Sequence, residues 1–97
     1  IDAGLDTVED GGKATTICVI VDIQKKKDKR GNQFAYLHVY KTSGIVEMIC
    51  WASQYARYSN LISKGSGLAI LCKRKENSYI VEKMKPYKQW LQDREIA

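Results

Sequence analysis

Residues 31–51 read GNQFAYLHVYKTSGIVEMICW. Two apolar runs alternate residue by residue, and the segment Lys41-Thr42-Ser43-Gly44 joins them. Because successive side chains of a strand point to opposite faces, the runs predict strands over residues 34–41 and 45–51. A short turn at Thr42-Ser43-Gly44 would make them a hairpin.

The first of these strands has two unlike faces. One face carries Phe34, Tyr36, His38 and Tyr40, and the other carries Ala35, Leu37 and Val39. The small aliphatic set is the natural core face, so the rings are expected to point outward. On the second strand, Val46, Met48 and Cys50 are expected to face the core, which leaves Glu47, Ile49 and Trp51 beside the rings.

Further strands flank this hairpin in the sequence. Residues 15–27 are rich in β-branched side chains and predict an unusually long strand, with Ile17, Val19, Val21 and Ile23 on one face. Residues 67–73 and 79–84 predict a second hairpin around the tight turn Glu76-Asn77, and Pro86 ends it.

Two helices are expected as well. Ser53 is positioned to cap a helix that carries Tyr55, Tyr58 and Leu61/Ile62 at helical spacing, with Lys64-Gly65 as its end. Residues 87–95, with Trp90 and Leu91, predict a short second helix after Pro86.

The order of elements is a three-stranded meander, a helix and a hairpin. That is the order of the OB-fold, a five-stranded Greek-key barrel, here with one helix between strands three and four and a short C-terminal helix. We therefore predict an all-β chain with a linker at 1–13, the OB-fold domain at 14–85 and a helical extension at 86–97. No glycine lies between Thr15 and Lys29, so the bend of the first strand requires a bulge without glycine. An SH3-like barrel, the alternative, would not need the helical insert.

The charge is unevenly distributed along the 97 residues. Four of the 11 acidic residues lie within the first ten positions, which hold no basic residue. The rest of the chain has 16 basic and 7 acidic residues, a net charge of +9. A basic body of this size favours a polyanionic partner, nucleic acid first and an anionic membrane surface second, although a positive surface also serves solubility alone.

Several other classes of function find little support. The longest apolar stretch, residues 17–21, is far below the ~20 residues of a membrane span, and no membrane partner is expected. Cys18, Cys50 and Cys72 lack metal-site spacing and are expected to be buried free thiols in a reducing compartment. A single histidine, scattered carboxylates and no glycine-rich phosphate loop indicate a binding module without cofactor or catalytic residues. Ile1 is not a natural start, which suggests part of a longer protein.

The OB topology turns the aromatic row into a candidate binding site. Its ligand surface is the outer face of strands two and three, flanked by the loops after strands one and four. Rings beside lysine-rich loops suit single-stranded nucleic acid, and we expect the two basic loops to merge into one patch. The candidate residues are Lys25, Lys26, Lys27, Lys29, Arg30, Phe34, Tyr36, His38, Tyr40, Trp51, Lys73, Arg74 and Lys75. Alternatively, His38 is an ordinary strand residue, Trp51 packs against the helix, and Tyr87, Trp90, Leu91 or a neighbouring domain covers the rings.

Over residues 13–85 the chain resembles the OB-fold (tRNA-anticodon-type nucleic-acid-binding) domain of the bacterial DNA polymerase III alpha subunit. Matching elements occur in the family's order: Lys29-Arg30-Gly31, Ala35-Tyr36-Leu37, Ser43-Gly44, Val46-Glu47 and Tyr55. The chain departs from the family at Asp28, where threonine is usual, at Trp51-Ala52, which replaces Phe-Pro, and at Tyr40-Lys41. This last change replaces an acidic pair and should favour phosphates.

The resemblance implies a non-catalytic module of a cytoplasmic replicative DNA polymerase that contacts the single-stranded template. Its partners would be single-stranded DNA, with RNA as the alternative, and other domains or subunits of that DNA-directed DNA polymerase. The family's catalytic aspartates belong to another domain, so none is expected here. Two other functions remain open: an anticodon-type domain that binds folded RNA, and a domain whose aromatic face docks a protein.

Overall fold

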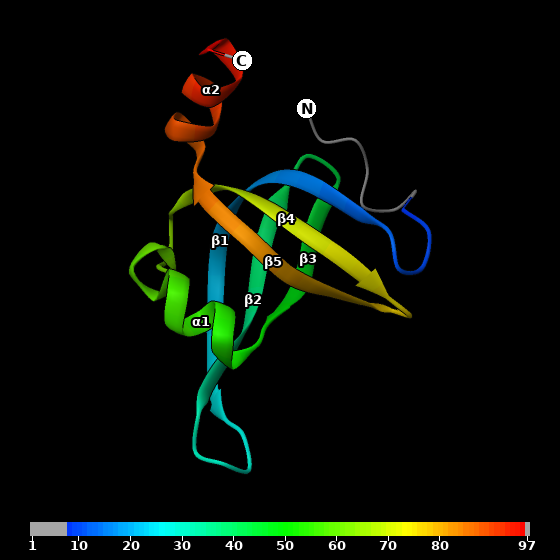
Figure 1. Ribbon diagram of the computed structural model, residues 1–97, viewed down its shortest axis with the longest axis vertical. Helices are drawn as coiled ribbons and strands as arrows, with labels where there is room; N and C mark the ends of the chain where they lie inside the picture. Colours follow the sequence, from blue (N-terminus) through cyan, green and yellow to red (C-terminus); the bar gives the residue numbers. More distant parts are fainter. Residues whose placement is uncertain (1–7, 97) are drawn as a thin grey trace.

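The alternating stretch forms the predicted hairpin, and the other strands close it into a barrel. The computed structural model describes residues 8–96, with side chains through residue 94. Its strands are β1 (Lys13–Lys27), β2 (Gln33–Lys41), β3 (Gly44–Cys50), β4 (Gly67–Lys75) and β5 (Ser78–Pro86). They form a closed barrel in the order β1-β2-β3-β5-β4 (Figure 1), which is the Greek-key order predicted for the OB-fold.

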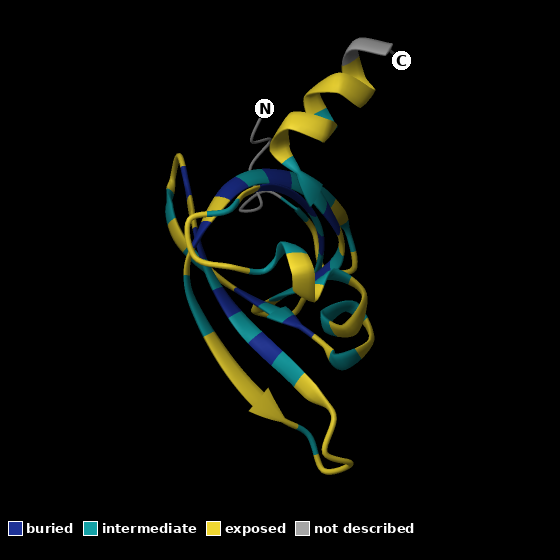
Figure 2. Ribbon diagram, turned by 90° about the vertical axis from the view of Figure 1, so that its left-hand side faces the viewer, coloured by how far each residue is buried: buried dark blue, intermediate teal, exposed yellow. Residues whose placement is uncertain are grey.

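The interior of the barrel confirms the expected faces of the central hairpin. Ala35, Leu37 and Val39 of β2 are fully buried, as are Met48 and Cys50 of β3. In Figure 2 the buried positions alternate with more exposed ones along the strands and lie within the barrel body. Strict alternation fixes the register of a strand, because a slip of one residue would exchange the two faces.

The four apolar residues expected on one face of β1 do not share a face, because Ile23 packs against the core whereas Val19 and Val21 are exposed. Thr16, Cys18 and Ile20 point into the barrel, whereas Val19 and Val21 are exposed. The pairing of β1 with β2 shifts between Ile20 and Asp22, which is the bulge without glycine that the sequence required. Beyond the bulge Ile23 packs against the core. Since β1 is apolar on both faces, its sequence pattern could not decide which face is buried.

The helix between β3 and β4 is shorter than predicted and begins differently. It comprises α1 (Ala52–Tyr58) followed by the 3₁₀ turn η2 (Ser59–Leu61). Trp51 occupies the N-cap position without a side-chain hydrogen bond, so Ser53 is not the cap. Tyr55 and Tyr58 lie on α1 as predicted, whereas Leu61 lies in the 3₁₀ turn and Ile62 follows it. All four pack against the buried cluster.

Gly65 does not end the helix but joins the connection to β1. It has a φ of +87°, and its N–H donates to the carbonyl of Ile20 over 2.8 Å. The N–H of Ile20 in turn donates to the carbonyl of Ser66 over 3.1 Å. The segment before β4 thus pairs with β1 at the bulge.

The barrel closes through a short parallel contact between β3 and β5. Only two register pairs, Met48 with Tyr79 and Ile49 with Ile80, define it. After β5, the helix α2 (Tyr87–Ile96) projects away from the barrel (Figure 1). Neither α1 nor the described part of α2 has the length and apolar composition that a membrane-spanning helix requires.

Candidate nucleic-acid interface

The outer face of β1, β2 and β3 is organised as a ladder of cross-strand rows. Phe34, Tyr36, His38 and Tyr40 all lie on this outer face, as the alternation predicts. The register places Lys26 opposite Phe34, Gln24 opposite Tyr36, Asp22 opposite His38 and Val19 opposite Tyr40. On the other side, β3 places Ile49, Glu47 and Ile45 opposite Tyr36, His38 and Tyr40. The rows differ in chemistry, so the face has three distinct parts.

The first part is an aromatic cluster at the end of β2 next to the β1–β2 loop. The Phe34 ring lies 5.0 Å from the Trp51 ring and 5.8 Å from the Tyr36 ring, centroid to centroid. The Nζ atom of Lys26 lies 5.9 Å from the centroid of Tyr36. Trp51 is 44% exposed. Trp51 therefore belongs to the outer surface together with the rings of β2, and we call Phe34, Tyr36 and Trp51 the aromatic platform.

The second part is an acidic row in the middle of the face. His38 Nε2 lies 3.0 Å from Glu47 Oε2, and His38 Nδ1 lies 3.9 Å from Asp22 Oδ2. Lys64 adds a contact of 3.5 Å to the other oxygen of Asp22. His38 is thus held between two carboxylates rather than presented to a ligand. Two negative charges at this point oppose a phosphate, and Asp22 was not among the residues that the sequence singled out.

The third part is apolar and lies beyond the acidic row. Tyr40 is 55% exposed and Ile45 is 65% exposed, and Val19 lies beside Tyr40 on β1. Tyr87 approaches from the start of α2 and lines a hollow of about 290 Å³ together with Tyr40. Lys41 is buried, and its Nζ donates to Ser43 Oγ. The expectation that Tyr40-Lys41 would favour phosphates is therefore wrong for Lys41.

The β1–β2 hairpin extends past the barrel as a basic arm. Lys25, Lys26, Lys27, Lys29 and Arg30 are all exposed. Asp28 shapes the turn, because its Oδ1 accepts the N–H groups of Arg30 and Asn32, each over 2.9 Å. Gly31 supplies a φ of +83°. The departure from threonine at residue 28 thus provides an acceptor that orders the loop between the lysines.

The second basic cluster is engaged by the chain itself. Arg74 donates from Nη1 to the carbonyl of Val8 over 2.7 Å, and its backbone pairs with Gly11 and Gly12. Asp10 Oδ1 accepts the N–H of Glu76, which has a φ of +56°, over 2.6 Å. Residues 8–12 of the expected linker at 1–13 therefore lie along the β4–β5 hairpin, and Lys13 already belongs to β1. Residues 1–7 fall outside the described part of the chain.

The two basic clusters do not merge into one patch. Lys73 pairs with Lys13 at the start of β1. The lysines of the β1–β2 arm lie at the opposite end of β1, where residues 25–27 pair with the start of β2. Figure 1 shows the two hairpin tips projecting from separate corners of the barrel. Of the two basic clusters, the one on the β1–β2 arm adjoins the aromatic platform. Lys73, Arg74 and Lys75 form a separate positive region.

The α2 helix leaves the aromatic platform uncovered. Its main contacts are to β4 and β5, and Trp90 lies on that side of the barrel with Leu71 and Lys85. Tyr87 reaches Tyr40 but not the far end of β2. Of the rings in the β2 row, Tyr40 is thus the one that Tyr87 adjoins, and neither pocket that α2 lines includes Phe34, Tyr36 or Trp51.

The three cysteines are buried in strands, as expected. Burial raises the pKa of the Cys50 thiol from 9.0 to about 12. The pKa of Cys72 is also raised, first by burial and then by the nearby Cys18 and Glu82. Cys72 Sγ lies 3.4 Å from Met48 Sδ in the core. Within residues 8–94, no group of three or more histidine, cysteine or acidic side chains is arranged to hold a metal ion.

Comparison with known proteins gives likeness in structure but not in sequence. No protein-family model matches the chain, and no curated protein sequence matches it significantly. Two crystal structures of Rim1, a mitochondrial single-stranded DNA binding protein of S. cerevisiae, match it with TM-scores of 0.63 and 0.61. The first match covers 80% of this chain and 96% of Rim1 at 9% identity; the second covers 80% and 97% at 10% identity. Strand order, helix placement and these likenesses agree, and the chain has an OB-fold.

Proposed function

We propose that this domain binds single-stranded DNA through the aromatic platform and the β1–β2 arm. The observation that carries the proposal is the position of Phe34, Tyr36 and Trp51, which stand together on the outer face beside five exposed basic side chains. Bases stack on such rings with ~1–3 kcal/mol each, and lysines along the arm neutralise the phosphates that connect them. The fold likeness to Rim1, named as a single-stranded DNA binding protein, supports the same function.

The geometry suggests which way the strand runs. Along β2 toward Tyr40, the path would cross the carboxylates of Asp22 and Glu47, which repel phosphate. From Trp51 over Phe34 toward Lys26, every group is aromatic or basic. We therefore propose that the strand crosses the sheet at the arm end of the platform, so that the arm contacts the backbone.

The proposed function is non-catalytic, and the domain would be one module of a larger protein. The matches at Lys29-Arg30-Gly31, Val46-Glu47 and Tyr55 favour the alpha subunit of a bacterial replicative DNA polymerase as the parent protein. In that protein, which would be cytoplasmic, the domain would hold the single-stranded template DNA near the polymerase active site. Sequence flanking this chain in its gene tests this placement directly, because polymerase sequence before residue 1 would support it and unrelated sequence would contradict it.

A salt titration with a fluorescent oligothymidylate tests the binding itself. Each phosphate neutralised in a single strand contributes a slope of about −0.7 in log K against log salt. With about three to five contacts, affinity should fall steeply between low and physiological salt. A variant with four charge reversals on the arm should lose binding and keep a nearly unchanged thermal transition, since all four positions are exposed. The four changes to Glu are at Lys25, Lys27, Lys29 and Arg30.

A matched pair of single variants controls for net charge. Lys27→Glu on the arm and Lys88→Glu on α2 reverse one exposed lysine each, and only the first should weaken binding. A flat salt response, or equal effects of the two variants, would contradict the proposal. Equal binding of oligouridylate and oligothymidylate would extend it to RNA, and a strong preference for one folded RNA would replace it with an anticodon-type function.

A further inference from the structure

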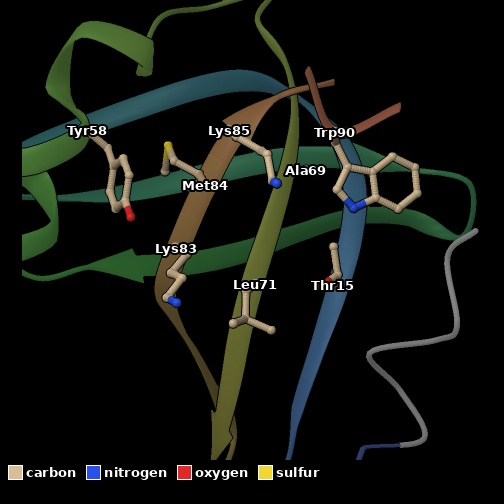
Figure 3. A pocket seen from close by; sticks show the side chains of 8 residues that line it. All are labelled: Thr15, Tyr58, Ala69, Leu71, Lys83, Met84, Lys85 and Trp90. Carbon is tan, nitrogen blue, oxygen red and sulfur yellow. The ribbon is translucent and has the colours of Figure 1, made fainter. Parts of the chain in front are cut away.

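A second groove lies on the outer surface of β4 and β5, away from the aromatic platform. It has a volume of about 330 Å³ and runs between Tyr58, near the end of α1, and Trp90 of α2 (Figure 3). Lys83 and Lys85 of β5 lie between these two aromatic side chains. The groove is thus bounded by rings and contains two ammonium groups.

Strand pairing explains why a hollow forms here. Thr15, Leu71 and Lys83 lie side by side in one row across β1, β4 and β5, and Ala69 lies opposite Lys85 in the next. Ala69 points outward by strand alternation, is 3% exposed, and lines the groove together with Trp90 of α2. Short side chains form the floor, and the larger Tyr58 and Trp90 rise at either end.

Trp90 is held in place by its own helix. The Arg94 guanidinium lies 4.7 Å from the centroid of the Trp90 ring, and the Tyr87 ring stacks with Trp90 at a centroid distance of 6.1 Å and an interplanar angle of 23°. In Figure 3 the nitrogen side of the Trp90 indole is turned toward Thr15 and the groove. Trp90 therefore offers the groove a hydrogen-bond donor at a fixed edge, together with the hydroxyl of Thr15.

The charges in and around the groove favour an anion. Lys85 is paired with Asp93 over 2.6 Å, which ties α2 to β5. Lys83 is exposed, and no carboxylate within the described residues pairs with it. Arg94, over the Trp90 ring, adds positive charge on α2. Asp93 is paired with Lys85 and Glu82 with Lys13, which leaves Lys83, among the described groove residues, as the cation without a carboxylate partner and favours a negative ligand.

We propose that this groove is a second contact for single-stranded nucleic acid, in which Lys83, Lys85 and the Trp90 N–H hold a phosphate group. The volume is in the range of sites for small ligands and accommodates one nucleotide unit. A strand that reaches both this groove and the aromatic platform gains affinity through the linkage of two contacts. The inference goes beyond the proposed function, because it concerns another face of the barrel and different side chains.

The two tryptophans of the chain allow the two sites to be read separately. In Trp51→Phe protein, Trp90 is the remaining tryptophan, and its emission should change on titration with oligothymidylate. In Trp90→Phe protein, Trp51 reports the aromatic platform. A response of Trp51 without a response of Trp90 overturns the second contact and leaves the proposed function intact. The reverse result overturns the proposed function and supports the second contact.

Lys83→Glu in the Trp51→Phe background tests the chemistry of the groove. This change leaves the Lys85–Asp93 tie of α2 untouched. It should lower the affinity reported by Trp90 about four- to eightfold, the effect of losing about one phosphate contact at low to physiological salt. Lys88→Glu, on α2 but outside the groove lining, should leave that affinity nearly unchanged.

Competition identifies the kind of anion. Oligothymidylate should displace polyglutamate from the groove at equal charge concentration. If polyglutamate alters Trp90 emission as strongly as oligothymidylate does, the groove is a site for acidic polypeptide and the nucleic-acid assignment is overturned. If Lys83→Glu and Lys88→Glu act equally, the response of Trp90 reflects overall charge, and the proposed contact is likewise overturned.

Discussion

The rings of Phe34 and Trp51 lie 5.0 Å apart and are tilted by 34°, although one belongs to β2 and the other follows the end of β3. Neither ring reaches the barrel core, where β2 contributes Ala35 and Leu37 instead. The pair therefore exists on the outside of the sheet, where its contacts add little to the free energy of folding and remain open to a ligand.

The ring pair predicts coupled losses of binding. Phe34→Ala and Trp51→Ala should each weaken oligothymidylate binding by ~1–3 kcal/mol, and the double variant should lose less than the sum because the rings touch. Fluorescence anisotropy of labelled DNA measures all four proteins. Additive losses would mean that the two rings hold separate bases.

Leu37→Ala is the control for the face of β2. Leu37 is fully buried, so its truncation should lower the free energy of unfolding by ~2–5 kcal/mol and leave binding by the folded fraction unchanged. Tyr36→Ala, its neighbour on the outer face, should show the opposite pattern. Urea unfolding by circular dichroism and binding on the same samples separate the two effects.

The acidic row predicts that loss of negative charge improves binding. Asp22→Asn and Glu47→Gln should each strengthen affinity by about 0.5–1 kcal/mol at low salt, because a carboxylate near the phosphate path repels it. The gain should shrink as salt rises. Glu82→Gln, which removes a carboxylate paired with Lys13, is the matched control and should have a smaller effect. Unchanged affinity in the Asp22 and Glu47 variants would contradict repulsion of a strand at the arm end by the acidic row.

Removal of the contact between Asp10 and Glu76 should loosen the β4–β5 turn locally. Asp10→Ala removes the acceptor of the Glu76 N–H at a residue with positive φ, so the β4–β5 turn should open more often. The substitution should lower the free energy of unfolding by about 0.5–1.5 kcal/mol, the net value of one such hydrogen bond. Hydrogen exchange of the Glu76 amide should become faster, while Glu9→Ala, beside it, should leave this exchange rate unchanged.

The buried thiols predict a loss of stability at alkaline pH. An unfolded cysteine releases its proton near pH 9.0, whereas Cys50 in the folded domain keeps its proton until about pH 12, and Cys72 also titrates later. Stability from these thiols is therefore complete below pH 9 and is lost above it, by up to ~1.4 kcal/mol per thiol for each pH unit. Urea unfolding at rising pH measures the slope. A Cys50→Ala/Cys72→Ala protein should have a flatter profile, and an equal slope in both proteins would contradict this cause.

The sequence was most informative where a strand alternates strictly. Ala35, Leu37 and Val39 are all aliphatic and their neighbours are not, so both faces of β2 and the hairpin to β3 were predicted correctly. The long β1 resisted the same reasoning, because Thr16, Cys18 and Ile20 are as compatible with burial as Ile17, Val19 and Val21. Its bulge was expected from the absence of glycine, but the position of the bulge was not.

The candidate site was predictable in its residues but not in its grouping. Which residue of β1 faces His38 depends on the bulge at Ile20 and Asp22, so the acidic row could not be foreseen. Likewise, the backbone carbonyl of Val8 that accepts from Arg74 has no signature in side-chain chemistry. Basic residues near a loop can be counted from a sequence, whereas their partners are settled by distant segments.

The contact between β3 and β5, with two register pairs, determines where the barrel opens. β1 and β4 are joined by seven register pairs, so the barrel opens most readily where β3 meets β5. An opened barrel is a five-stranded sheet with β3 and β5 as bare edges, and bare edges pair with other chains. Resistance of this domain to aggregation therefore depends on the short parallel contact at Met48–Tyr79 and Ile49–Ile80 more than on its larger interfaces.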